Sequence, residues 1–122
     1  MNIEHLNIDG MDIAVISSDE TVITDVQSAL DLAMTVKYET GAANIVIGKK
    51  LICEDFFILS TKLAGEILQK FINYRVKMAV YGDYSRYTSK PLKDFIYESN
   101  QGKNFFFTAT KEEAIQKLTQ TI

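Results

Sequence analysis

The chain has 122 residues, 47% of them hydrophobic, and a net charge of -3 with a pI near 5.1. This length and apolar content suffice for one common core, so residues 1–122 are expected to form a single domain. The acidic balance argues against nucleic acid as a partner, because duplex binding usually requires a basic stripe. No apolar run reaches the length of a membrane span, and the N-terminus lacks the pattern of a secretion signal. We therefore expect a soluble, cytoplasmic protein with no membrane partner.

The first third of the chain predicts a hairpin followed by a helix. Residues 3–8 and 11–16 are apolar-rich runs separated by Asp9-Gly10, a pair that accepts positive φ at both central positions of a tight turn. Thr24 and Gln27 have the spacing of a capping box, which predicts that a helix begins at Thr24. Apolar residues then recur on one helical face, and Gly41 can supply the left-handed residue that ends the helix.

The remaining elements alternate between strand and helix. Residues 43–47 form a brief β-branched run ended by Gly48, which fits a central strand, and residues 49–59 are irregular. Apolar positions at helical spacing predict a helix over about 61–74. A strand over 76–81, a helix from near Ser89 to Gly102, a strand over 105–107 and a helix capped by Thr110 and Glu113 complete the chain.

The predicted order is therefore ββαβαβαβα. Strands that alternate with helices require right-handed crossovers and a mostly parallel sheet, here with an antiparallel hairpin at its start. The expected fold class is α/β, with a mixed, mostly parallel sheet covered by helices. Phe106 is expected to face away from Phe105 and Phe107 on a strand that is covered on both faces.

Several reaction classes lose support because their residues are missing. The one histidine, His5, lies in the first strand, where a partly exposed structural role is the simplest interpretation. The sequence contains no nucleophile elbow, phosphate-binding glycine loop or paired-histidine zinc motif. Cys53 is the one cysteine, and the neighbouring Glu54 and Asp55 disfavour its thiolate, so we interpret it as structural. No cofactor or metal site is predicted, and an enzyme is the less favoured class.

The best candidate site is the loop that follows the strand over 76–81. It lies at the carboxyl end of a buried strand, where open α/β sheets bind ligands, and it is rich in hydrogen-bond donors. An anionic small molecule could bind there. The alternative is structural: the helix-start serine caps the helix, the tyrosines pack on a neighbour, and the arginine pairs with an acid such as Asp83. The candidate ligand-binding residues are Asp83, Tyr84, Ser85, Arg86, Tyr87, Ser89 and Lys90.

A second candidate is a phosphorylation site at Ser60 or Thr61, two hydroxyl residues at the start of the long helix. Phosphate is tolerated electrostatically at a helix start, yet it would alter any apolar surface there. The alternative is again an N-cap. The preceding segment, residues 56–59, is too apolar for an ordinary surface loop, and it either seals the core or binds a partner.

Five runs in the sequence resemble an uncharacterised bacterial family known as domain of unknown function 4180. The likeness covers almost the whole chain and implies no activity. The runs begin at Val22 (Val-Ile-Thr-Asp-Val-Gln-Ser-Ala-Leu-Asp-Leu), Glu54 (Glu-Asp-Phe-Phe), Leu63 (Leu-Ala-Gly-Glu-Ile-Leu-Gln-Lys-Phe-Ile-Asn-Tyr-Arg), Gly82 (Gly-Asp-Tyr-Ser-Arg-Tyr-Thr-Ser-Lys) and Asp94 (Asp-Phe-Ile-Tyr-Glu-Ser-Asn).

A more distant resemblance is to the sulfate-transporter and anti-sigma-factor-antagonist (STAS) domain. It is carried by the element order and by an apolar segment that leads into Leu59-Ser-Thr-Lys-Leu-Ala-Gly at a helix start. The resemblance implies a small switch module whose helix-start serine is phosphorylated by a partner kinase, which would be Ser60 or Thr61 here. Leu59 stands where an aspartate normally precedes that serine, and the preceding loop is longer.

Together these observations predict a STAS-like α/β protein that acts as a regulatory or binding module with a protein partner. The alternative is an anionic-ligand sensor or enzyme that uses the loop after the strand over 76–81. Self-association into a homodimer, through exposed strand edges or residues 56–59, is a third expectation.

Overall fold

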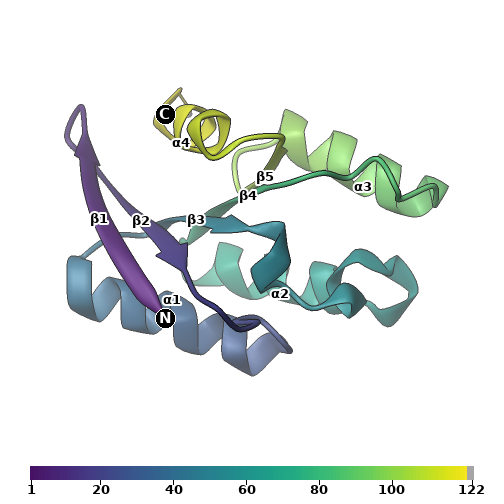
Figure 1. Ribbon diagram of the computed structural model, residues 1–122, viewed down its shortest axis with the longest axis horizontal. Helices are drawn as coiled ribbons and strands as arrows, with labels where there is room; N and C mark the ends of the chain where they lie inside the picture. Colours follow the sequence, from purple (N-terminus) through teal and green to yellow (C-terminus); the bar gives the residue numbers. More distant parts are fainter. Residues whose placement is uncertain (121–122) are drawn as a thin grey trace.

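The structure is a computed structural model that describes residues 1–120. Its elements follow the predicted order ββαβαβαβα (Figure 1). Three short 3-10 turns, η1 (Lys49–Leu51), η2 (Glu54–Phe57) and η3 (Leu59–Thr61), fill the connection that the sequence marks as irregular. The strands are β1 (Asn2–Ile8), β2 (Met11–Ser17), β3 (Asn44–Gly48), β4 (Lys77–Tyr81) and β5 (Phe105–Thr108), and the helices are α1 (Val26–Thr40), α2 (Leu63–Asn73), α3 (Lys90–Gln101) and α4 (Lys111–Gln120).

The five strands form one mixed sheet in the order β1-β2-β3-β4-β5. β1 pairs with β2 in an antiparallel hairpin, and β2 to β5 are parallel. Asp9 and Gly10 have φ values of 53° and 85° in the turn between β1 and β2, so the predicted hairpin is confirmed with the backbone that its sequence favours. The predicted α/β class is thereby confirmed.

The helices are divided unequally between the two faces of the sheet. Residues of α1, α2 and α3 pack in one hydrophobic cluster with alternate strand residues such as Ile45 and Val80. The opposite strand residues, among them Val46 and Ala79, pack with Ala114 and Leu118 of α4. Phe106 belongs to the α4 face, whereas Phe105 and Phe107 belong to the other, and all three are buried, as predicted.

Strand order bears directly on where a ligand could bind. β4 lies between β3 and β5 and its central residues are fully buried, which confirms the predicted central strand. The parallel strands follow one another in sequence order, and α1, α2 and α3 all pack on one face. The crevice that doubly wound sheets offer arises where strand order reverses, and no such reversal occurs among the described strands.

Most helix ends follow the predicted local signals. Gly41 ends α1 in the left-handed conformation with φ 75°, and Ser89 caps α3. The Glu113 amide donates to the Thr110 hydroxyl oxygen at 3.2 Å, as expected at the start of α4.

The capping box predicted for α1 is wrong by one residue. The N-cap is Asp25 instead of Thr24, and its carboxylate accepts from the Ser28 amide at 2.7 Å. The Ser28 hydroxyl oxygen accepts in turn from the Asp25 amide at 3.0 Å, so Ser28 replaces Gln27 as the reciprocal partner. A carboxylate is a strong acceptor for free helix amides, which favours Asp25 as the cap.

The predicted start of the long helix also needs correction. α2 begins at Leu63, and its N-cap is Lys62, which has φ 68° and makes no side-chain cap. Ser60 and Thr61 therefore lie before the helix in turn η3 instead of at its N-cap.

Candidate functional site

The loop between β4 and α3 begins in contact with the turn that follows β3. The Gly82 amide donates to the Thr108 carbonyl oxygen at 3.0 Å, which fixes the end of β4 beside β5. A β-carbon at Gly82 would lie 2.8 Å from the β-carbon of Lys49, a separation that real side chains do not tolerate. Glycine therefore lets the two loops meet at the carboxyl edge of the sheet.

Two tyrosines of this loop pack onto Phe57 of η2 instead of projecting toward a ligand. The ring of Tyr87 stacks on Phe57 with centroids 5.4 Å apart and an interplanar angle of 18°. Tyr84 lies 6.3 Å from Phe57 and donates its hydroxyl to the Val80 carbonyl oxygen at 2.7 Å. Burial raises the pKa of the Tyr84 phenol well above its ordinary value, so this group stays a neutral structural donor.

Arg86 forms an ion pair across the same contact. Its guanidinium lies 2.5 Å from a carboxylate oxygen of Glu54, and the Tyr87 hydroxyl donates to the other oxygen at 3.1 Å. The pKa of Arg86 is raised by its hydrogen bond to Tyr87 and by the charge of Glu54. The structural alternative expected an acidic partner for Arg86, and the partner is Glu54 instead of Asp83. These three residues, the Glu54–Arg86–Tyr87 cluster, join η2 to the β4–α3 loop.

Three more of the candidate polar residues also have internal partners. Asp83 accepts from the Ser85 amide at 2.8 Å, and the pKa of Asp83 is lowered by its hydrogen bonds to Ser85. Ser89 accepts from the Leu92 amide at 3.4 Å, which caps α3. Lys90 pairs with Asp94 at 2.6 Å, and this pairing raises the pKa of Lys90. An incoming anion would have to compete with each of these contacts.

The two hydroxyls before α2 differ in their surroundings. The Thr61 hydroxyl lies 2.7 Å from the Asp55 carbonyl oxygen and 2.8 Å from that of Ile58, and it accepts from the Leu63 amide at 3.3 Å. The Thr61 hydroxyl therefore stabilises turn η3 through these hydrogen bonds. Ser60 is exposed and its side chain makes no hydrogen bond among residues 1–120.

The structure brings part of each predicted candidate site into one groove of about 360 Å³, with Ser60 from one site and Arg86, Tyr87 and Ser89 from the other. One wall is formed by η2 and η3, and the other by the β4–α3 loop with the start of α3. In Figure 1 both walls lie at the end of the molecule away from β1. Ile58, whose residue surface is 48% exposed, stands at the rim. Phe56 and Phe57 are buried, so the prediction that this segment seals the core holds for them. The lining residues are Phe57, Ile58, Leu59, Ser60, Arg86, Tyr87, Thr88, Ser89, Pro91 and Leu92.

Sequence reasoning missed Lys49. Its ammonium lies 4.9 Å from the ring centroid of Tyr87 and 5.6 Å from that of Phe57. The signal available was the polar pair Lys49-Lys50 directly after Gly48, at the carboxyl end of a predicted central strand. Both lysines line a second cleft, of about 390 Å³, that is shared by the ends of β2, β3 and β4.

The remaining singled-out residues lie elsewhere. His5 is partly exposed on β1, as the structural interpretation predicts, and it pairs with Asp12 at 2.9 Å. Cys53 is half-buried, with its sulfur 3.5 Å from the Thr24 carbonyl oxygen. Residues 1–120 contain no group of His, Cys, Asp or Glu side chains arranged to hold a metal ion.

Fold and site together define an α/β protein whose candidate site is a groove between two loops that are bonded to each other. The chain belongs to the family described as "Domain of unknown function (DUF4180)", whose model matches residues 8–118. This confirms the resemblance read from the five sequence runs. A comparison with curated proteins finds no match. Within residues 1–120, no helix has the length and apolar character needed to span a bilayer.

Proposed function

We propose that this chain is a cytoplasmic regulatory module, formed by residues 1–122 as one STAS-like domain, that binds a protein partner in the groove between η2–η3 and the β4–α3 loop. The observation that carries the proposal is the internal pairing of the loop. Arg86 and Lys90 each hold an acid of this chain, and Tyr84 and Tyr87 pack inward, so the loop serves as a wall. The groove contains no base positioned beside a nucleophile, which argues against catalysis.

The groove suits a protein partner because its walls are ordered before binding. Stacking of Tyr87 on Phe57 and the Glu54–Arg86 ion pair fix the two loops, so little conformational entropy is lost on association. Ile58 offers apolar surface at the rim, and the hydroxyls of Ser60 and Thr88 offer hydrogen bonds beside it. An apolar centre with a polar rim is the usual composition of a protein interface.

Ser60 is the better of the two phosphorylation candidates under this proposal. Its side chain is exposed, whereas the Thr61 hydroxyl is occupied by contacts to Asp55, Ile58 and Leu63. A phosphate on Ser60 would place about two negative charges at the groove rim and oppose docking of an apolar anchor. The resemblance of the element order to that of STAS domains supports this proposal.

Site-specific photo-cross-linking tests the proposal. A photoreactive benzoylphenylalanine at Ile58 is expected to give one discrete protein adduct in the cells that make this chain. The same probe at Tyr38, 93% exposed on α1, is the matched control and is expected to give no adduct of that mass. Thr88→Arg, added to the Ile58 probe, should lower the yield about tenfold, as expected for a loss of about 1.4 kcal/mol at the groove. Equal adducts from both positions, or an undiminished yield with Thr88→Arg, would contradict the proposal.

A second candidate function rests on the cleft lined by Lys49 and Lys50. The cleft also includes Asp83, so an anionic ligand there would touch the predicted loop as well as the end of β3. If such a ligand is sensed or converted, inorganic phosphate or a nucleotide should raise the melting temperature. Lys50→Gln should abolish that shift, and Lys37→Gln on α1 should leave it intact. No shift in the unsubstituted chain, or an equal shift in Lys50→Gln, would exclude this candidate.

A further inference from the structure

The two edges of the sheet differ in whether other residues bond their outward main-chain groups. At the β5 edge, the Asn100 side chain of α3 donates to the Phe107 carbonyl oxygen at 3.2 Å and accepts from the Phe107 amide at 2.8 Å. These bonds occupy main-chain groups that would otherwise be open for pairing. The β1 edge has no such cover among residues 1–120, and Figure 1 shows β1 at the margin of the molecule. An open edge is a template for another strand.

Hairpin geometry identifies which groups of β1 are open. Ile8 and Met11 flank a two-residue turn, so this pair exchanges both of its main-chain hydrogen bonds. Bonded and non-bonded pairs alternate along an antiparallel ladder, so the amides and carbonyls of Ile3, His5 and Asn7 point away from β2. The Asn44 side chain, which bonds the Asp12 carbonyl from the β3 side at 3.1 Å, agrees with this alternation.

We propose that β1 pairs with β1 of a second copy, in antiparallel orientation, to form a symmetric homodimer with a continuous ten-stranded sheet. A two-fold axis normal to the sheet keeps the helical layers of the two copies on the same sides. The register that pairs all of Asn2–Ile8 places His5 opposite His5 of the second copy and Ile3 opposite Asn7 of the second copy. Each of the three outward pairs then exchanges two main-chain hydrogen bonds.

Side chains favour this register over its neighbours. It places Glu4 opposite Leu6 of the second copy, whereas a shift toward the N-terminus would place the two Glu4 carboxylates opposite each other, which is destabilising. A shift the other way leaves Asn2 and Ile3 without partners. Each His5 ring stays bonded to its own Asp12 carboxylate, which supplies a compensating negative charge near the axis.

The sequence of β1 lacks most of the features that normally block edge pairing, and Glu4 is its one acidic residue. Its seven residues, NIEHLNI, contain no proline and no lysine, and the ladder with β2 is regular along its whole length, without a bulge. Ile3, Leu6 and Ile8 are only partly buried in the monomer. β1 lies away from the groove between η2–η3 and the β4–α3 loop, so dimerisation does not depend on the proposed function.

Analytical ultracentrifugation of the full chain tests this inference. The mass is expected to rise with concentration from 13.8 kDa toward twice that value. His5→Pro removes one outward amide and leaves the ladder to β2 intact, so it should remain monomeric at every concentration. His5→Gln is the matched control, because it changes the same side chain and keeps the amide, and it should dimerise like the unsubstituted chain. A constant mass of 13.8 kDa, or dimerisation of His5→Pro, overturns the inference.

Amide hydrogen exchange provides a second measurement that does not require the proline variant to fold. In concentrated samples of the unsubstituted chain, the amides of Ile3, His5 and Asn7 should exchange at least about tenfold more slowly than in dilute samples. The amides of Leu6 and Ile8, which bond β2 in the monomer, serve as internal references. Fast exchange of the three outward amides at all concentrations overturns the inference.

Discussion

Phe56→Ala is expected to lower the free energy of unfolding by about 3–5 kcal/mol, the range found for removal of a buried aromatic side chain. Phe56 is fully buried, and its ring lies 5.0 Å from that of Phe57, 6.3 Å from Phe105 and 6.4 Å from Phe107. Its loss would leave a cavity between η2 and the sheet, and the groove wall formed by η2 would lose its anchor.

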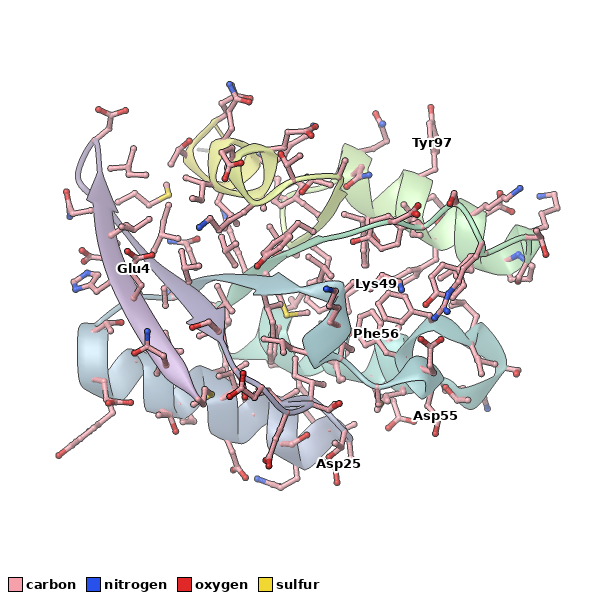
Figure 2. All side chains as sticks on the ribbon, in the orientation of Figure 1. Glu4, Asp25, Lys49, Asp55, Phe56 and Tyr97 are labelled. Carbon is pink, nitrogen blue, oxygen red and sulfur yellow. The ribbon has the colours of Figure 1, made fainter. Side chains whose placement is uncertain are left out.

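Tyr97→Ala is the matched control for this prediction. Tyr97 is 68% exposed on α3, and Figure 2 shows it pointing away from the molecule whereas Phe56 points toward the sheet. Its removal should change the free energy of unfolding by less than about 0.5 kcal/mol. Urea unfolding followed by circular dichroism measures both variants. Equal effects for the two would show that Phe56 is not the anchor of η2.

Gly82→Ala is expected to destabilise the protein by about 2–4 kcal/mol, because overpacking and backbone strain add at this position. The new β-carbon would lie 2.8 Å from that of Lys49, and φ at Gly82 is 158°. Pairing between Gly48 and Tyr81 fixes the ends of β3 and β4. The loops that follow these strands therefore cannot move apart to relieve the clash. The turn that holds Lys49 over Tyr87 should shift as a result.

Gly65→Ala supplies a control of opposite sign. Gly65 lies within α2, and nothing stands within 4 Å of a β-carbon placed there. Alanine is the better helix former, so this variant should be about 0.5–1 kcal/mol more stable than the unsubstituted chain. Thermal unfolding of the two variants side by side checks the prediction. A neutral Gly82→Ala would mean that the contact between the two loops is looser than described.

Signals that act over a few residues made much of the fold predictable. The Asp9-Gly10 turn, the left-handed Gly41 and the Ser89 cap each depend on neighbours in sequence, and each was predicted. The cap of α1 was misplaced because two overlapping pairs, Thr24 with Gln27 and Asp25 with Ser28, both have the required spacing. Only the path of the chain decides between them.

The arrangement of the candidate site could not be predicted in the same way. Glu54 and Arg86 are 32 residues apart, and their ion pair depends on how three successive 3-10 turns place η2 beside the β4–α3 loop. Irregular turns carry no periodic pattern, so sequence analysis found the two halves of the groove as separate candidates. It expected a ligand at the loop after β4, whereas the cleft at the end of β4 is also lined by Lys49 and Lys50 of η1, which sequence analysis did not single out.

The central claim is that the groove between η2–η3 and the β4–α3 loop is where a protein partner binds. The most direct measurement is the ratio of cross-linked adduct formed from a photoprobe at Ile58 to that formed from the same probe at Tyr38. We predict a discrete adduct from Ile58 alone, reduced about tenfold by Thr88→Arg. Adducts of the same mass and yield from both positions, insensitive to Thr88→Arg, would contradict the claim.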